Sequence, residues 1–398
     1  MGIAKKIIQR AGLAVSLDNI FIFLFLAIFP FGQIVRLSFN FAGYNVPIHP
    51  IDIIVGLGAT YSLLFQRQKP KIFLYFRYFV VIVFFSYILS ISVFGKDVLY
   101  GFFYLLRRIA YFLFLSYVWN FVRKSQGAKK ILVDSLLAIS VVSAVFGWMQ
   151  FFLVPDIRPF FVYNWDMHLY RLVGTFLDPS FLGLIIVFGL IISLYRYISE
   201  HENKYILVSV FLLLSLAFTY SRASFVAFGA GVAVLAILHK KYRKIVIWIL
   251  GLVFIASLLP TARNQTIRLD RTFSIFSRVA NYSQTLTIFK KHPVFGVGFN
   301  NLCVARNKYI GIEDFSSHAC SGSDSSILFI LATTGVVGLM IFLGSVYWVF
   351  KQYGKSREFR FITPIIAALF VHSFFSNSIF FPWVMGYMSI LLGASLKE

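Results

Sequence analysis

The sequence predicts an all-α integral membrane protein with about twelve membrane-spanning helices. Hydrophobic residues make up 59% of the 398 residues and charged residues only 13%. Soluble domains usually carry about 25% charged residues, so this chain cannot cover itself with polar surface and needs a bilayer as its solvent. The chain also contains 48 Phe, 21 Tyr and 6 Trp. Such aromatic residues suit lipid-facing surfaces and headgroup belts.

Apolar segments long enough to cross a bilayer recur along the whole chain. A spanning helix needs roughly 20 mainly apolar residues. Such segments lie at about 20–35, 50–65, 72–93, 101–122, 130–153, 180–197, 204–219, 224–238, 244–259, 324–350, 361–375 and 378–395. No part between them is large enough for a separate soluble domain. We therefore expect residues 1–398 to form one polytopic membrane domain.

The net charge of +22 is distributed unevenly between alternate loops. Basic clusters such as Lys240 and Lys241 fall on one side, together with both termini. The short loops of the other side hold only Arg36, Lys96 and Arg222. Because basic short loops stay in the cytoplasm, we expect both termini to be cytoplasmic. Topology explains the charge, so we expect the bilayer, and no nucleic acid, as a partner.

Two predicted outer segments are long, at about residues 155–179 and 260–323. Long loops without a domain of their own are usually functional, which places the chemistry at the outer face. Transporters coupled to protons generally need carboxylates inside the membrane. No acidic residue lies in the middle of a predicted span, so a transporter is the disfavoured class.

The outer segment 260–323 contains a set of regularly spaced arginines. Arg268, Arg271 and Arg278 would share one face of a helix, because three and seven residues are close to whole turns. Guanidinium groups bind phosphate oxygens through two parallel hydrogen bonds and keep their charge. These arginines would suit a lipid diphosphate. The alternative is an interfacial helix whose arginines face lipid headgroups.

Three further arginines are candidates. Arg222 lies in a very short outer connection, where it either binds an anion or extends toward the headgroups. Arg107 and Arg108 lie roughly two turns below the outer end of the fourth predicted span. A cation at mid-membrane costs on the order of 2.5–3.5 kcal/mol. At least one of this pair should therefore face a polar cavity.

His318 and Asp324 flank the start of the tenth predicted span. Either side chain could act as a general base toward a sugar hydroxyl. Asp324, or a serine beside it, could instead cap the helix. Cys303 and Cys320 lie in the same outer segment, and they either form a disulfide or remain buried thiols. No set of metal ligands is present in the sequence, so we expect a metal-independent protein without a cofactor.

Several motifs occur together in a specific order. Arg171, Gly174, Thr175 and Phe176 precede Asp178-Pro179-Ser180; next come Ser221-Arg222, Ser277-Arg278, the turn Lys291-His292-Pro293 with Gly296 and Gly298, and Asp324-Ser325 with Gly335 and Gly338. In this order and spacing the chain resembles the O-antigen ligase and O-antigen polymerase family. The resemblance covers residues 171–345, including the segment 260–323. The large outer segment before a late span is also similar.

The resemblance implies a GT-C-type membrane glycosyltransferase of the bacterial inner membrane. Its donor would be a glycan linked to undecaprenyl diphosphate at the periplasmic face. The acceptor would be lipid A core for a ligase, or another lipid-linked glycan for a polymerase. The reaction would be inverting and metal-independent. Arg222 and Arg278 match the family's diphosphate-binding arginines, and Arg171 is a further cavity candidate.

One position departs from the ligase pattern. Ligases carry a His-Asn pair where this chain has Asp324-Ser325, and that histidine is the proposed base of ligases. Asp324 would then act as the base, or His318 would do so from the loop. The departure favours a polymerase over a ligase. A lipid or sugar transporter is the alternative of another class.

Overall fold

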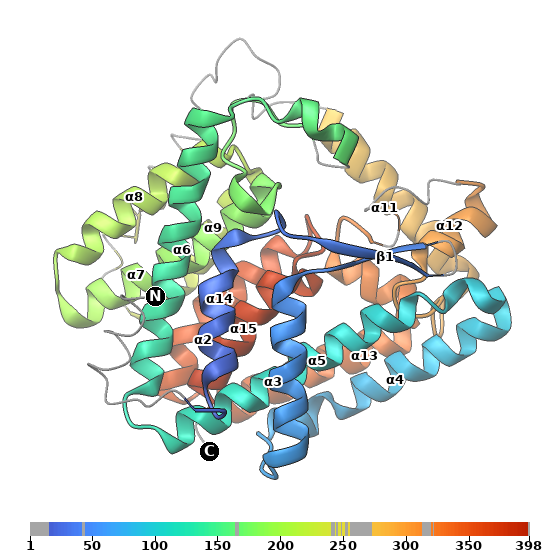
Figure 1. Ribbon diagram of the computed structural model, residues 1–398, viewed down its shortest axis with the longest axis horizontal. Coiled ribbons are helices and arrows are strands. Elements are labelled where there is room, and N and C mark those ends of the chain that lie inside the picture. Colours follow the sequence, from blue (N-terminus) through green and yellow to red (C-terminus); the bar gives the residue numbers. More distant parts are fainter. Residues whose placement is uncertain are drawn as a thin grey trace.

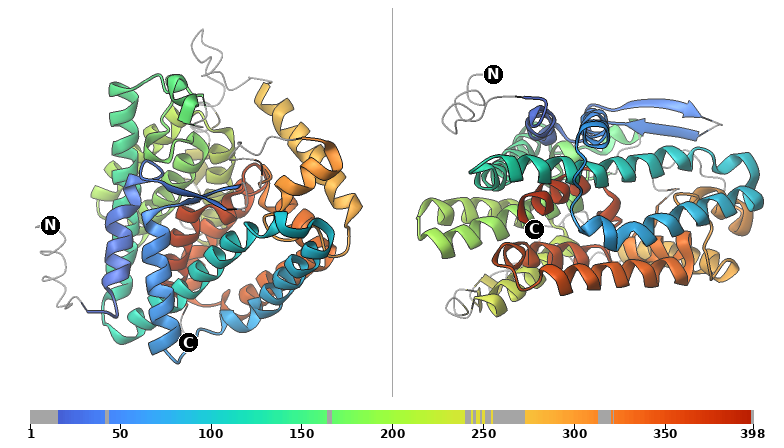
Figure 2. Two further views of the ribbon diagram at one scale, coloured as in Figure 1. Left: turned by 45° about the vertical axis from the view of Figure 1, so that its right-hand side comes forward. Right: turned by 90° about the horizontal axis from the view of Figure 1, so that it is seen from below.

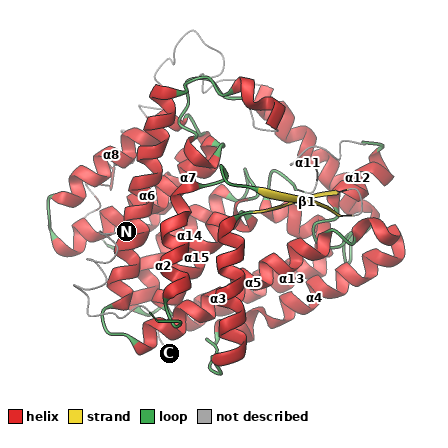
Figure 3. Cartoon of the chain, in the orientation of Figure 1, coloured by secondary structure: helices red, strands yellow, loops and turns green. Residues whose placement is uncertain are grey.

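The computed structural model describes residues 16–41, 44–163, 167–239, 273–312, 320 and 322–396, with residues 243, 246, 247, 249, 250 and 254. This part of the chain is mostly helical and contains thirteen α-helices (Figure 1, Figure 3). They are α2 (Ile20–Ile28), α3 (Pro50–Phe65), α4 (Ile72–Phe94), α5 (Gly101–Lys124), α6 (Ala128–Leu153), α7 (Pro179–Glu200), α8 (Lys204–Thr219), α9 (Arg222–Leu238), α11 (Phe273–Lys291), α12 (Leu302–Ile310), α13 (Ser326–Tyr353), α14 (Arg357–His372) and α15 (Pro382–Ser395). Short 3-10 turns are η1 (Phe29–Phe31), η2 (Gly95–Val98), η3 (Arg158–Tyr163), η4 (Gly174–Phe176) and η6 (Ser378–Phe380).

Five helical segments are long and apolar enough to cross a membrane. They are Ile72–Val98, Gly101–Lys124, Ala128–Leu153, Pro179–Glu200 and Ser326–Tyr353. The chain is therefore an integral membrane protein, as its composition predicted. The apolar helices α3, α8 and α9 are shorter, and most of the ninth predicted span lies outside the described residues. The count of about twelve spans stays a prediction.

The helix ends that were predicted to lie outside contact one another, and we call this region the site end. The hydroxyl of Thr175, before α7, donates to the Pro30 carbonyl after α2 (2.6 Å). The hydroxyl of Tyr100, before α5, donates to the Asn300 carbonyl before α12 (2.9 Å). This grouping agrees with the predicted alternation of the spans. Which side faces the cytoplasm stays a prediction.

The opposite helix ends form a second region, the basic end. There Lys124 pairs with Asp18 (3.0 Å), and Arg196 pairs with Asp134 (2.5 Å). The Trp119 indole donates to the Leu396 carbonyl (3.1 Å), which holds the end of α15 against α5. Both termini of the described chain lie at this end, consistent with the prediction that they share a side.

A β-hairpin occupies the site end where the sequence indicated only a short connection. Strands β1 (Leu37–Phe41) and β2 (Tyr44–Ile48) pair antiparallel, with Phe39 opposite Val46. The rings of Phe39 and Phe41 pack against Phe103 of α5, with centroids 5.2 and 5.0 Å apart. Figure 2 shows the hairpin along one face of the helices. Alternating apolar residues in such a short stretch are a weak signal.

Two clusters of buried side chains form the core. The larger cluster surrounds α7, whose residues from Leu182 to Ser193 are almost all buried. The smaller cluster joins α4, α5, α12 and α13. The two meet at η6, because Phe380 packs with the smaller cluster and Phe381 stacks on Phe181 of α7 with centroids 3.8 Å apart. The candidate site lies beside this junction.

Candidate active site

Helices α7 and α9 begin side by side at the site end. Asp178 caps α7 by accepting hydrogen bonds from the amides of Ser180 (2.5 Å) and Phe181 (3.2 Å). Ser221 caps α9 by accepting from the Ser224 amide (3.3 Å), and the Ser224 hydroxyl donates to the Ser180 carbonyl (3.1 Å). The first amides of a helix carry positive partial charge. Two positive helix ends therefore lie next to each other.

Helix α13 begins at the same place. Ser325 caps it, and the Ser326 amide donates to the Ser373 carbonyl just after α14 (2.8 Å). The Ser326 hydroxyl donates to the Ser376 carbonyl (3.3 Å), and the Ser376 and Ser180 hydroxyls are 3.2 Å apart. Three helix amino ends thus meet around the loop of residues 373–378. Such an arrangement favours a bound anion.

Helix α11 carries Arg278 and is fixed near these three helix amino ends by the turn that follows Arg278. The Tyr282 hydroxyl donates to the Phe374 carbonyl (2.6 Å), and the Asn281 amide oxygen accepts from the Asp324 amide (2.9 Å). Burial raises the pKa of the Tyr282 phenol, Arg278 opposes this shift and Asp324 adds to it. The phenol is therefore a neutral donor. Arg278, four residues earlier, lies on the same helix face.

Arg278 is half-buried on α11. Within the described part of the chain it forms no ion pair with a carboxylate. Its charge acts on the buried His372 at the end of α14. Ser224 is 3.3 Å from the same imidazole and lies two residues after Arg222, the first residue of α9. The start of α9, with Arg222 as its first residue, therefore lies close to the imidazole on which Arg278 acts.

A glycine turn after α11 fixes that helix against α13. The amides of Val297 and Gly298 donate to carbonyls of α13, and the Val336 amide donates back to the Pro293 carbonyl (2.9 Å). Gly335 breaks the helical geometry of α13 here with a φ of 69°. A Cβ on Gly335 would lie 2.0 Å from the Val294 carbonyl oxygen. The glycines of this motif therefore allow two backbones to touch, which the sequence pattern alone did not reveal.

Residues 207–343 match the O-antigen ligase family. We call this stretch the ligase-family segment; it lies within the region 171–345 where the motifs resembled that family. It contains Arg222, Arg278 and Asp324, whereas Ser180 and His372 lie outside it. No curated protein matches the chain. The match supports transfer of lipid-linked glycans, of the ligase or polymerase type, and it does not separate these two.

Asp324 lies directly before α13 in the ligase-family segment. Ser325, not Asp324, supplies the side-chain cap of that helix. The part of Asp324 as a base stays a prediction. Arg268, Arg271 and His318 lie outside the described residues, so the predicted arginine face and the loop histidine stay predictions too.

A disulfide and a buried arginine hold the approach to Asp324. Cys303 and Cys320 are joined, which decides between the two alternatives that the sequence left open. Arg306, 4% exposed, donates to the carbonyls of Cys320 and of Gly322 (2.9 Å to the latter). Burial lowers the pKa of Arg306, and Asp324 opposes this shift. The backbone before Asp324 is thus tied to α12.

Arg171 positions the turn that precedes Arg222. It is 3% exposed, and its guanidinium donates to the carbonyls of Thr219 (3.0 and 2.8 Å) and Tyr220 (3.1 Å). Tyr220 has a left-handed φ of 49°, which a fixed carbonyl partner helps to maintain. Arg171 was predicted as a cavity candidate. The structure places it under the Tyr220–Arg222 turn.

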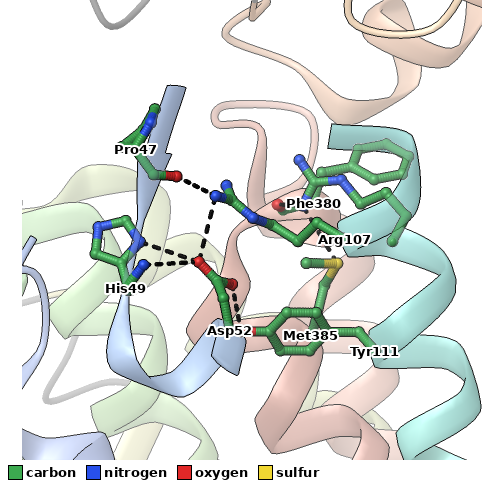
Figure 4. A network of polar contacts seen from close by, with 8 residues as sticks. Pro47, His49, Asp52, Arg107, Tyr111, Phe380 and Met385 are labelled. Carbon is green, nitrogen blue, oxygen red and sulfur yellow. Dashed lines mark hydrogen bonds and ion pairs between the residues drawn. The ribbon is translucent and has the colours of Figure 1, made fainter. Parts of the chain in front are cut away.

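Arg107 lies in a buried network of polar groups (Figure 4). It pairs with Asp52 of α3 (3.3 Å), and the two side chains are 10% and 9% exposed. The Pro47 carbonyl of the hairpin also accepts from Arg107, while Asp52 accepts from the Tyr111 hydroxyl (3.0 Å) and the His49 amide (2.9 Å). The polar surroundings expected for this arginine are provided by protein groups.

Arg108 meets η6, the turn at the junction of the two cores. Its guanidinium donates to the Phe380 carbonyl and lies 3.3 Å from the Met385 sulfur. It also lies over the Phe380 ring, 5.3 Å from the centroid. Arg108 therefore supports the turn that follows the loop of residues 373–378.

Two site residues were missed from the sequence, His372 and Tyr282. A histidine at the end of an apolar span, followed by serines at 373, 376 and 378, was the available signal for the first. The available signal for Tyr282 was its position one helical turn after Arg278. Neither signal is specific, because their importance depends on partners far away in the chain.

Proposed function

We propose that the protein transfers a glycan from undecaprenyl diphosphate to an acceptor hydroxyl at the periplasmic face of the inner membrane. The observation that carries this proposal is Arg278, half-buried on α11 and, among the described residues, without an ion pair to a carboxylate, near three helix amino ends of which one begins with Arg222. Fixed cations and helix ends are the groups that bind a diphosphate. The match over residues 207–343 supports a lipid-linked donor.

In the proposed reaction the acceptor oxygen attacks the anomeric carbon from the side opposite the diphosphate. The bond between that carbon and the diphosphate oxygen breaks, and the lipid diphosphate leaves with inversion at the sugar. Arg222 and Arg278 stabilise the charge that develops on the leaving group. Asp324 accepts the proton of the attacking hydroxyl. In this proposal the arginines supply the positive charge without a metal ion.

The residues just before α7 support a lipid substrate. An apolar pocket lies between the end of α6 and the turns η1 and η4. It is lined by Phe31, Phe146, Val154, Ile157 and Leu177 among others. Such a lining suits a polyprenyl chain. We propose a GT-C-like arrangement of about twelve spans with both termini cytoplasmic.

A polymerase is the favoured form of this activity. The ligase pattern has a histidine base where this chain has Asp324, so the acceptor is proposed to be another lipid-linked glycan. The second candidate is a ligase that transfers to lipid A core, and the O-antigen ligase description of the matched family supports it.

The test uses the purified full-length protein in nanodiscs with an undecaprenyl diphosphate-linked glycan. Elongated glycans and free undecaprenyl diphosphate are measured by mass spectrometry and gel electrophoresis. Arg278→Ala should lower the rate by about 10²–10³-fold, as removal of a preorganised charge-stabilising group does. The rate of Arg278→Lys should lie between those of wild type and Arg278→Ala, since lysine keeps the charge and lacks the planar guanidinium. Lys290→Ala removes an exposed cation from the same helix and is the matched control.

The same assay separates the alternatives. A parallel sample with lipid A core shows whether that acceptor is used, which would replace polymerase by ligase. A transporter would move the lipid-linked glycan across a vesicle membrane without forming a glycosidic bond. Normal product from Arg278→Ala would contradict the proposal.

A further inference from the structure

His372 contacts serine hydroxyls of three different elements at the site end. It is fully buried at the end of α14. Its Nε2 lies 3.1 Å from the Ser180 hydroxyl of α7 and 3.3 Å from the Ser224 hydroxyl of α9. Its Nδ1 lies 2.6 Å from the Ser378 hydroxyl of η6. One imidazole therefore joins three elements that are far apart in the chain.

We assign the protons of the ring from the neighbouring hydrogen bonds. The Ser378 hydroxyl donates to the Ser376 carbonyl (3.3 Å), so it accepts from His372 and Nδ1 carries the proton. The Ser224 hydroxyl donates to the Ser180 carbonyl (3.1 Å), which leaves the Ser180 hydroxyl to donate to Nε2. With a neutral ring, the Ser224 hydroxyl contacts Nε2 at 3.3 Å and is linked to the imidazole through Ser180. The Nε2 lone pair is then occupied.

The partners of His372 connect it to both arginines of the site. Ser224 lies in the first turn of α9, which begins with Arg222. On the other side, Ser378 follows the loop whose Phe374 carbonyl accepts from Tyr282, one turn after Arg278. The start of α9 and the fixed turn of α11 are thus linked through the imidazole and the loop that follows it.

We propose that His372 is a positioning residue, which holds Arg222 opposite Arg278 at the spacing that a lipid diphosphate requires. This inference rests on the proposed function and adds a residue to it. A buried histidine could also be considered as the base in place of Asp324. The occupied Nε2 argues against that role, since a base needs a free lone pair facing the acceptor.

Three substitutions distinguish positioning from base catalysis. A glutamine amide reaches the place of Nε2 and can still accept from the Ser180 hydroxyl, whereas an asparagine amide reaches only the place of Nδ1. His372→Gln should stay within about tenfold of the wild-type kcat, while His372→Ala and His372→Asn lose about 100-fold, the effect of a displaced catalytic geometry. The rise of kcat/KM with pH should be the same in His372→Gln and wild type. His201→Ala, at the basic end, is the control for loss of an imidazole.

Two results would overturn the inference. If His372 is the base, His372→Gln is as inactive as His372→Ala and the rising limb of its pH profile disappears. If the residue serves stability alone, all three variants melt at lower temperature, yet kcat per folded molecule is unchanged.

A binding measurement tests the same link without glycan transfer. Undecaprenyl diphosphate is titrated into wild type, His372→Ala, Ser224→Ala and the double variant. A shared link predicts that the losses of affinity are not additive. The affinity of the double variant should lie within about twofold of that of the single variant that binds more weakly. Additive losses would contradict the link. Because no glycan is transferred, failure of the proposed reaction leaves this test intact, and the two failures can be told apart.

Discussion

Two arginines of the site end, Arg107 and Arg278, have opposite surroundings. Arg107 is almost fully buried, and its guanidinium forms an ion pair with the Asp52 carboxylate at 3.3 Å. Arg278 is half-buried on α11, one turn before the tyrosine that binds the Phe374 carbonyl, and no carboxylate of the described residues forms an ion pair with it. Both were candidates on the basis of sequence alone. The surroundings, not the residue type, separate them.

The difference shows how a membrane protein can use the same side chain for two purposes. A buried cation with a carboxylate partner is neutralised, and breaking the pair leaves an uncompensated charge. A cation that faces positive helix ends is kept there at a cost, and an incoming anion relieves that cost. We therefore expect changes at Arg107 to affect stability and changes at Arg278 to affect binding and turnover.

The largest effect is expected from removing the partner of Arg107. Asp52→Asn leaves the guanidinium buried without a countercharge, which costs about 3–5 kcal/mol. The free energy of unfolding, measured in detergent, should fall by this amount, while kcat of the folded fraction is retained. The double variant Asp52→Asn with Arg107→Met should recover part of the loss. If Asp52→Asn were as stable as wild type, Arg107 would not differ from Arg278 in its effect on stability, and the comparison would fail.

The second effect concerns the disulfide near Asp324. Cys303→Ser opens a link between residues 17 apart in sequence, which lowers the free energy of unfolding by about 3 kcal/mol in the chain-entropy model. Reduction of the wild type should produce the same decrease in melting temperature. Reductant should have no effect on Cys303→Ser itself. Insensitivity of the wild type to reductant would show that this link does not support the loop.

A third experiment gives Arg278 the kind of partner that Arg107 has. Tyr282→Glu places a carboxylate four residues after Arg278 on the same helix face. Donor turnover should fall by about 100-fold, equivalent to about 2.7 kcal/mol. Tyr282→Gln has the shape of the glutamate variant without its charge, so it is the matched control for loss of the phenol. Equal activity of the two variants would show that the charge of Arg278 is not used.

The smallest effect is expected from Tyr282→Phe, which removes the hydrogen bond to the Phe374 carbonyl. The loss of stability should be about 1 kcal/mol. The folded phenol has a pKa above its ordinary value of 10.0. Its stabilisation is therefore complete below pH 10 and is lost as the pH rises through the higher folded pKa. The difference in free energy of unfolding between wild type and Tyr282→Phe should therefore shrink from neutral to alkaline pH. A difference that stays constant with pH would contradict this assignment.

Local and compositional properties were within reach of the sequence. The excess of apolar residues requires a bilayer, and it placed long apolar helices such as α4, α6 and α13 close to their observed bounds. The order of the glycine, arginine and aspartate motifs indicated the family that residues 207–343 match. These properties depend on residues next to one another or on simple sums, so no knowledge of folding is needed.

Only the tertiary structure decided which charges are paired and which groups form the site. Asp52 and Arg107 come from different helices, and His372 meets Ser180 across 192 positions of the chain. An ion pair or a hydrogen bond exists only at short distance, and packing of distant helices sets that distance. For the same reason the hairpin and the disulfide could not be decided beforehand. The sequence supplies the candidate groups, and the folded bundle selects among them by bringing some within contact of one another.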